Sequence, residues 1–284
     1  MIFIIGASGL IGGNILNYLK KKGYKVSGTY FKTKKKGLYY FDIAKHDIKK
    51  LKIKKKINHL IIASAINVNL DDTKKNFKNS YFINVTKTKK IIDHCFKNNI
   101  IPIYLSSDGV FDGKKGHYIE TDKKNPLHSY GKNKDEVEKY ILKKQGKHII
   151  IRVSRVFSDN KNDKNFITLM KKNLYSRNKI LCPDDQFFSP IFTADLSKYL
   201  EKLIKDNHTG IFHLTSIKSI THYEVAQTVK TFFKIKNVKI LPCKINSFQL
   251  IEKRPLLTNL LMYKFEKLFN VKYQNLKYYL KKIK

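Results

Sequence analysis

Tyr130 and Lys134 lie four residues apart in segment 126–144, whose apolar spacing predicts a helix, so the two side chains share a face. A tyrosine, with a pKa of about 10, can donate a proton in catalysis when a nearby cation lowers that pKa. Tyrosine and lysine have the same spacing at Tyr18 and Lys22, Tyr140 and Lys144, Tyr263 and Lys267, and Tyr273 and Lys277. Position selects Tyr130, because its helix follows an apolar strand that ends in Ser106-Ser107. A serine hydroxyl there could hold a carbonyl oxygen, so the group predicts reduction of a ketone.

Three glycines, Gly6, Gly9 and Gly12, follow a short apolar strand and open an amphipathic helix. In this context the first glycine permits a tight turn, the second lets the backbone approach a pyrophosphate, and the third lets helix and strand pack closely. The free N–H groups of the helix would face the phosphates. We therefore expect a dinucleotide cradle made by Gly6, Ser8, Gly9, Leu10, Ile11 and Gly12.

The segment after the second predicted strand indicates which dinucleotide is bound. A site selective for NAD usually has an acidic residue there, and segment 28–34 has none. Lys32 or Lys34 could instead pair with a 2′-phosphate, which favours NADPH, with NADH as the second choice. Asp42 and Ile43 follow the next apolar segment, and we expect them to contact the adenine.

Apolar strands alternate with helical patterns through the first half of the chain, which predicts an α/β fold. The expected strands are 2–5, 24–30, 59–65, 100–106 and 147–154, and the expected helices are 10–22, 80–98 and 126–144. The strands have the continuous apolar runs of a doubly wound parallel sheet of the Rossmann type. We expect an NAD(P)-binding domain over residues 1–153 and a smaller α+β substrate lobe over 154–284, with segments interleaved between the two.

The composition excludes several classes of protein. The net charge is +36, but only four of the 58 basic residues are arginine and the lysines are spread along the chain. This pattern predicts a solvated lysine surface. A specific nucleic-acid site would usually contain more arginine. No apolar run reaches the roughly 18 residues of a membrane helix. The three scattered cysteines indicate a reducing, cytoplasmic setting, and the sequence has no metal-ligand spacing.

Several segments together resemble the extended short-chain dehydrogenase/reductases, and among these the dTDP-4-dehydrorhamnose reductase family. The clearest are LSSDGVFDG at 105–113 and SYGKNK at 129–134. The similarity continues in the same order along the chain, at 63–65, 84–85, 165–166, 185–190, 193–196, 210–214 and 254–255. A colinear series is more specific than any one of its motifs.

The resemblance implies NADPH-dependent reduction of a 4-keto-6-deoxy sugar carried on a nucleoside diphosphate. Ser107, where the family usually has threonine, corresponds to the catalytic hydroxyl, Tyr130 to the proton donor, and Lys134 to the residue that holds the nicotinamide ribose and lowers the tyrosine pKa. Cofactor contacts are implied for Ala63, Ser64, Ala65, Tyr130 and Lys134, and substrate contacts for Ser107, Asp108, Arg155 and Arg254. The expected partners are a nucleotide-sugar substrate and a second copy of the chain in a homodimer.

Two positions depart from the family pattern: Gly109 replaces the usual tyrosine, and Arg155 replaces the usual tryptophan. Two further hypotheses therefore stay open. One is another nucleotide-sugar reductase or an epimerase, and the other is a non-catalytic NADP-binding regulatory subunit like the β subunit of methionine adenosyltransferase. Arg254 has two interpretations, a ligand of the substrate diphosphate or a member of a structural ion pair.

Overall fold

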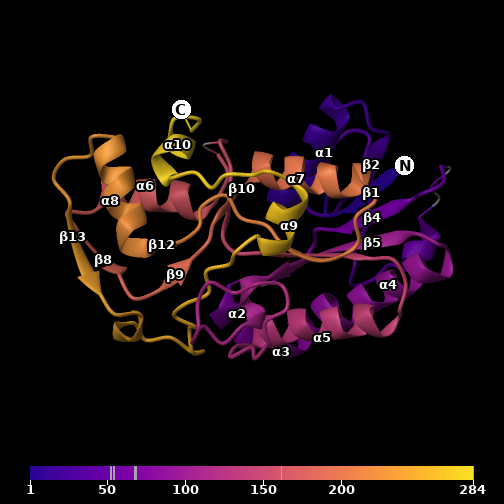
Figure 1. The fold of residues 1–284 in the computed structure, drawn as a ribbon, viewed down its shortest axis with the longest axis horizontal. Helices are drawn as coiled ribbons and strands as arrows, with labels where there is room; N and C mark the ends of the chain where they lie inside the picture. Colours follow the sequence, from indigo (N-terminus) through magenta and orange to yellow (C-terminus); the bar gives the residue numbers. More distant parts are fainter. Residues whose placement is uncertain (52, 54, 67–68, 161, 284) are drawn as a thin grey trace.

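A parallel sheet forms the centre of the computed structural model, which describes residues 1–51, 53, 55–66, 69–160 and 162–283 (Figure 1). Seven strands of the described chain pair in the order β11-β6-β5-β4-β1-β2-β3, each parallel to its neighbours. They are β1 (Ile2–Ile5), β2 (Val26–Tyr30), β3 (Tyr39–Tyr40), β4 (His59–Ile62), β5 (Ile101–Ser107), β6 (Ile149–Val153) and β11 (Gly210–His213). This order confirms the predicted Rossmann-type sheet.

Helices cover both faces of the sheet. Figure 1 shows α1 (Leu10–Lys21) and α7 (Thr193–Lys205) above the sheet, and α4 (Thr88–Lys97) and α5 (Ser129–Lys143) below it. Each layer has its own apolar core: Ile15, Leu19, Leu196 and Leu200 lie in the upper one, and Ile92, Val137 and Ile141 in the lower one. Both faces of the strands are therefore buried, which explains their continuous apolar sequences.

The strand order reverses between β1 and β4. From β1 the chain continues to β2 and β3 on one side, and it then crosses to β4, β5 and β6 on the other side. In open α/β sheets, ligands bind outside the carboxyl ends of the strands at such a point. The loops that follow β1, β4 and β5 meet at this edge of the sheet. The first two loops contain the glycine cradle and residues 63–66, and Ser107 is the last residue of β5.

Segment 80–98, predicted as one helix, is broken into three pieces. These are α3 (Phe77–Tyr81), a π-helical segment η2 (Phe82–Lys87) and α4. The wider turn of the π segment contains Asn84, whose side chain bonds to the backbone of a neighbouring loop. Such π segments inside helices occur frequently at functional sites.

A second apolar core lies in the part of the chain that follows β6. It packs α6 (Phe166–Ser176), α8 (His222–Phe232) and α10 (Leu276–Leu280) beside the two-stranded sheet of β8 (Lys179–Pro183) and β13 (Lys239–Cys243). Short strands β7 (Val156–Phe157) with β10 (Ile191–Phe192), and β9 (Phe187–Phe188) with β12 (Ile220–Thr221), form two further pairs. The short helices are η1 (Ile48–Lys50), α2 (Leu70–Lys75), η3 (Asp108–Val110), η4 (Ile245–Ser247) and α9 (Tyr263–Leu268).

The two lobes exchange segments of chain. β11 pairs with β6, and α7 packs against α1, so residues 193–213 lie in the sheet layers although they follow residue 154. A domain boundary at 153/154 stays a prediction. Across the described residues, no helix combines the length and the apolar character that crossing a membrane requires.

Candidate active site

The glycine loop between β1 and α1 requires glycine at two positions, one for its backbone conformation and one for a close backbone contact. Gly6 has a φ of +86°, a conformation that residues with a side chain rarely adopt. A Cβ atom on Gly12 would lie only 2.3 Å from the carbonyl oxygen of Gly6. α1 begins after Gly9 without a side-chain cap, so its first N–H groups stay available to an anion. The loop therefore fits a dinucleotide pyrophosphate, with Ser8, Leu10 and Ile11 in the loop and the first helical turn.

Residues 63–65 form the opposite wall of this loop. A Cβ on Gly6 would lie 3.1 Å from the backbone nitrogen of Ser64, so the two segments are in contact. The Ser64 hydroxyl is buried and has no hydrogen-bond partner within the described protein, as expected of a group that awaits a ligand. Asn84 holds the wall in place, because its Oδ1 accepts from the Ile66 N–H and its Nδ2 donates to the Ile66 carbonyl, both at 3.0 Å.

The predicted adenine side of the cradle lies after β3. Asp42 is buried, and its Oδ1 accepts the N–H of Ala44 at 2.9 Å, which fixes the turn that contains Ile43. Lys32 is exposed and has no contact that would assign it a role. Sequence reasoning missed Lys35, whose Nζ lies 3.5 Å from the Cβ position of Gly13 in the first turn of α1. The roles of Asp42, Ile43 and Lys32 toward the cofactor stay predictions.

Ser107 and Lys134 meet at the carboxyl end of β5. The Ser107 hydroxyl donates to Asp108 Oδ1 at 2.9 Å and accepts the N–H of Gly109 at 3.1 Å. Lys134 Nζ donates to the carbonyl oxygen of Leu105 at 2.7 Å and lies 5.5 Å from the centre of the Tyr130 ring. The fold thus brings together the three side chains that the sequence singled out for proton transfer.

A buried ion pair fixes the helix that contains Tyr130 and Lys134. Glu138 of α5 is fully buried and accepts from Arg152 of β6 at 3.0 and 2.8 Å. The same carboxylate accepts the hydroxyl of Ser106 at 2.5 Å. Because the carboxylate bonds to both strands, it fixes the position of α5, and with it Tyr130 and Lys134, against β5.

Burial changes the proton affinity of both members of the tyrosine–lysine pair. It raises the pKa of Tyr130, and the negative charge of Asp108 adds to this effect. Burial lowers the pKa of Lys134 to about 8, against the opposing effect of Glu138. The lowered tyrosine pKa expected from the sequence is thus not seen in the protein alone, because desolvation of the phenol outweighs any effect of the lysine. Tyr130 is fully protonated at neutral pH, which is the form that a proton donor requires.

The two predicted substrate arginines have different surroundings. Arg155 is exposed to solvent, and its guanidinium carbon lies 5.0 Å from the centre of the Phe188 ring. Arg254 is mostly buried and donates from Nη2 to Asp71 Oδ1 of α2 at 2.8 Å, while its Nη1 is buried without a partner in the described residues. Arg254 is therefore a member of an ion pair and also has a free donor. Asp108 acts electrostatically on Arg155, so this carboxylate and this cation lie in the same region.

Gly109 is covered by the imidazole ring of His128. A Cβ on Gly109 would lie 2.7 Å from Cε1 and 3.0 Å from Nε2 of that ring. The tyrosine usual at this position in the family would therefore overlap the ring. Glycine at position 109 leaves room for the His128 ring. Sequence reasoning missed His128 because no local pattern relates residues 109 and 128.

We expect Gly109→Ala to lower the free energy of unfolding by about 1–3 kcal/mol, since overpacking of a filled site costs this much. In a His128→Asn background the ring atoms are gone, and the same substitution should be nearly neutral. Urea unfolding of the four proteins in this double-mutant cycle measures the coupling. Equal losses in both backgrounds would contradict the contact.

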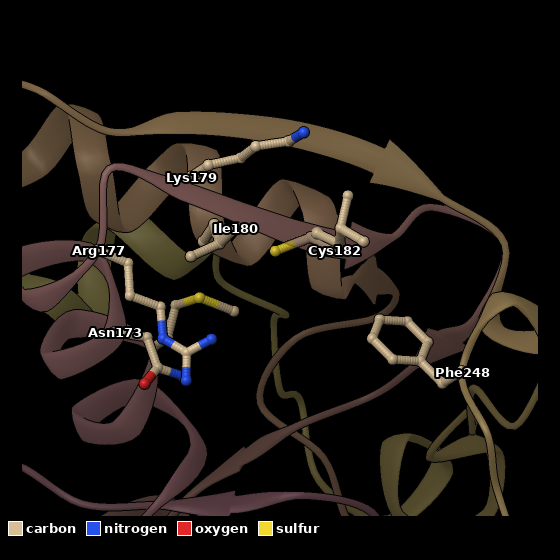
Figure 2. Close-up of a pocket in the computed structure, with 8 residues that line it drawn as sticks. Asn173, Arg177, Lys179, Ile180, Cys182 and Phe248 are labelled. Carbon is tan, nitrogen blue, oxygen red and sulfur yellow. The ribbon is translucent and has the colours of Figure 1, made fainter.

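A separate cavity of about 500 Å³ lies in the C-terminal lobe, between α6 and β8. Figure 2 shows the Arg177 guanidinium beside Asn173 in this cavity, with the Phe248 ring at its other end. None of the residues that line it is a candidate catalytic or cofactor residue. Among the described residues, no three His, Cys, Asp or Glu side chains lie together as metal ligands.

Comparison with known proteins matches residues 1–284 to the model of the RmlD substrate binding domain. A dTDP-4-dehydrorhamnose reductase of Aggregatibacter actinomycetemcomitans is 29% identical over 233 residues, 79% of this chain and 76% of that protein. The methionine adenosyltransferase 2 subunit beta of Xenopus tropicalis is 25% identical over 246 residues, 84% of this chain and 74% of that protein.

Solved structures give the same result for the fold. A dTDP-4-dehydrorhamnose reductase from Clostridium acetobutylicum superimposes with a TM-score of 0.87 at 27% identity, over 99% of this chain and 97% of that one. A dTDP-4-dehydrorhamnose reductase from Bacillus anthracis in complex with NADP has a TM-score of 0.86 at 22% identity, over 99% and 97% of the two chains. The second likeness concerns the fold alone.

Proposed function

The chain belongs to the RmlD substrate binding domain family, and on this premise we propose that it reduces the 4-keto group of a nucleoside-diphosphate 4-keto-6-deoxy sugar. It is an NAD(P)H-dependent oxidoreductase of the nucleotide-sugar reductase kind. The observation that supports the proposal is the position of Ser107 at the end of β5 and of Lys134, which bonds to the same strand at Leu105 and lies 5.5 Å from the centre of the Tyr130 ring. A cytoplasmic location and a homodimer stay predictions from the sequence.

NADPH is the cofactor that fits this site. Glycine at positions 6 and 12 lets the loop pack closely against α1, whose first N–H groups have no side-chain cap and can bind a pyrophosphate. The buried Ser64 hydroxyl, unpaired within the described residues, can also bind the cofactor. Lys35 would supply positive charge near the first turn of α1 for a 2′-phosphate. When bound, NADPH supplies the hydride that reduces the carbonyl carbon.

Side chains of the protein would bind and protonate the carbonyl oxygen of the substrate. Ser107 Oγ and the Tyr130 hydroxyl would donate hydrogen bonds to this oxygen, and Tyr130 would transfer its proton to it as the carbon becomes reduced. The product is then a hydroxyl group, and Tyr130 is left as a phenolate. The Lys134 ammonium group, 5.5 Å from the centre of the ring, would stabilise that negative charge until a proton returns.

Three charged residues could bind the nucleotide-sugar substrate. Asp108, held by the Ser154 hydroxyl at 2.7 Å, can accept from sugar hydroxyls. Arg155 and the free Nη1 of Arg254 can donate to the diphosphate. Because Asp71 already neutralises part of the Arg254 charge, we give Arg155 the larger share of the binding.

The affinity for NADPH should fall as the pH rises above about 8. Lys134 has a pKa of about 8 in the protein alone, and an anionic cofactor favours the charged ammonium form, so binding takes up a proton above that pH. The dissociation constant should be flat from pH 6.5 to 7.5 and rise by up to about tenfold per unit beyond 8.

Fluorescence titration of NADPH across pH 6.5–9.5 measures this dependence. Lys134→Met keeps most of the length of the side chain and removes the charge, so it should bind NADPH more weakly and lose the rise above pH 8. A wild-type profile that stays flat to pH 9.5 would show that Lys134 does not interact with the cofactor.

A second function, an NADP-binding regulatory subunit, is supported by two observations. Gly109 and Arg155 depart from the pattern that the family resemblance implies, and the methionine adenosyltransferase 2 subunit beta of Xenopus tropicalis is similar to this chain. A protein of this type would bind NADPH and would not turn over a ketosugar.

Turnover distinguishes the two functions. Purified protein, NADPH and dTDP-4-dehydrorhamnose should give a steady loss of NADPH absorbance, and UDP- and GDP-linked ketosugars in parallel would define the nucleotide. Tight NADPH binding without turnover of any ketosugar would favour the regulatory subunit.

A further inference from the structure

His128 is the N-cap residue of α5, the helix that contains Tyr130, and the capping hydrogen bond determines which nitrogen of the His128 ring is protonated. The backbone of His128 is extended, and its Nδ1 accepts the N–H of Gly131 at 2.9 Å. A ring nitrogen that accepts a hydrogen bond carries no proton, so the proton of the neutral ring is on Nε2. Burial lowers the pKa of His128, against the opposing effects of Asp108 and Glu252, so the ring is neutral at pH 7.

The Nε2 edge of the ring lies beside the catalytic serine. The Cβ position of Gly109 is 3.0 Å from Nε2 and 3.4 Å from the Ser107 hydroxyl oxygen, so both atoms border one small space. On its other side the ring lies along Tyr130, with centroids 6.5 Å apart and planes inclined by 23°. Within the described part of the chain, Nε2 has no hydrogen-bond partner, whereas Nδ1 is satisfied.

We propose that His128 binds the substrate: its Nε2–H donates a hydrogen bond to a hydroxyl oxygen of the sugar, next to the carbonyl held by Ser107 and Tyr130. The inference deepens the proposed function and depends on it. The ring takes the space into which a side chain at position 109 would extend, since a Cβ on Gly109 would lie 2.7 Å from Cε1 and 3.0 Å from Nε2.

The neutral ring is suited to this role and not to proton transfer. Its Nε2 proton is held tightly, because loss of it would leave a buried anion, so it can orient a hydroxyl without competing with Tyr130 for the carbonyl oxygen. A sugar hydroxyl beside the carbonyl would satisfy a donor that the protein leaves unpaired. The contact would select sugars that have an oxygen at that position.

His128→Asn separates this role from helix capping. Asparagine is a favoured N-cap residue, so its Oδ1 can accept the Gly131 N–H, but its shorter side chain has no group at the position of Nε2. His128→Ala removes both functions. The measurements are kcat and KM for dTDP-4-dehydrorhamnose, the NADPH dissociation constant and the melting temperature of each protein.

We expect His128→Asn to lose about tenfold in kcat/KM, with the melting temperature and the NADPH affinity of wild type. His128→Ala should lose at least as much activity and also melt at a lower temperature. Wild-type kcat/KM in the asparagine variant would overturn the inference and leave His128 a capping residue. Absence of turnover by wild type would overturn the proposed function, and this inference with it.

Discussion

Tyr130→Phe should lower kcat by about 10²- to 10⁴-fold, the usual contribution of general acid catalysis, and leave NADPH affinity nearly unchanged. The substitution removes one oxygen atom and keeps the ring, so the contacts with Lys134 and His128 persist. Steady-state kinetics on an established ketosugar and a fluorescence titration with NADPH measure the two effects.

Tyr140→Phe is the matched control on the same helix. Tyr140 has the same spacing to Lys144, but its hydroxyl donates to Asp93 of α4 at 2.6 Å. Its loss should leave kcat at the wild-type value. If the two phenylalanine variants behaved alike, Tyr130 would not be the proton donor.

Gly12→Ala should weaken NADPH binding by about 10- to 100-fold. The added methyl group would lie 2.3 Å from the Gly6 carbonyl oxygen, so α1 must move away from the loop that it supports. The first turn of the helix and the glycine loop would then lose their common fit to a pyrophosphate. The NADPH dissociation constant is the measurement.

The next residue supplies the control. A methyl group on Gly13 would lie 3.4 Å from the Ala7 carbonyl oxygen and 3.5 Å from Lys35 Nζ, which are ordinary contacts. Alanine is also favoured over glycine inside a helix by about 1 kcal/mol. Gly13→Ala should therefore bind NADPH like wild type and unfold at equal or higher urea concentration. Equal losses of affinity in the two variants would mean that the loop does not form the cradle.

The catalytic group could be predicted from the sequence because its signals are local. The glycine spacing, the strand that ends at Ser107, and the helix that contains Tyr130 and Lys134 each occupy a few consecutive residues. Parallel strands then bring their carboxyl ends to one edge of the sheet, so the fold class already implies the meeting of these groups.

Contacts between distant segments could not be predicted in this way. The ion pair between Arg254 and Asp71 joins residues 183 positions apart in the sequence. The packing of the His128 ring against Gly109 depends on how α5 is placed relative to β5. Lys35 rather than Lys32 lies near α1 because of the path of an exposed loop that has no periodic pattern. The raised pKa of Tyr130 follows from burial of the phenol, which a sequence pattern does not measure.

The transfer of deuterium from NADPH labelled at its reactive carbon tests the central claim most directly. With dTDP-4-dehydrorhamnose as substrate and both hydrogens of that carbon replaced by deuterium, mass spectrometry should find one deuterium on each reduced sugar formed by wild type, and the initial rate of labelling should be about 10²- to 10⁴-fold lower with Tyr130→Phe. Consumption of labelled NADPH without deuterium in the sugar, or equal initial rates of labelling by both proteins, would contradict hydride reduction of a ketosugar assisted by Tyr130.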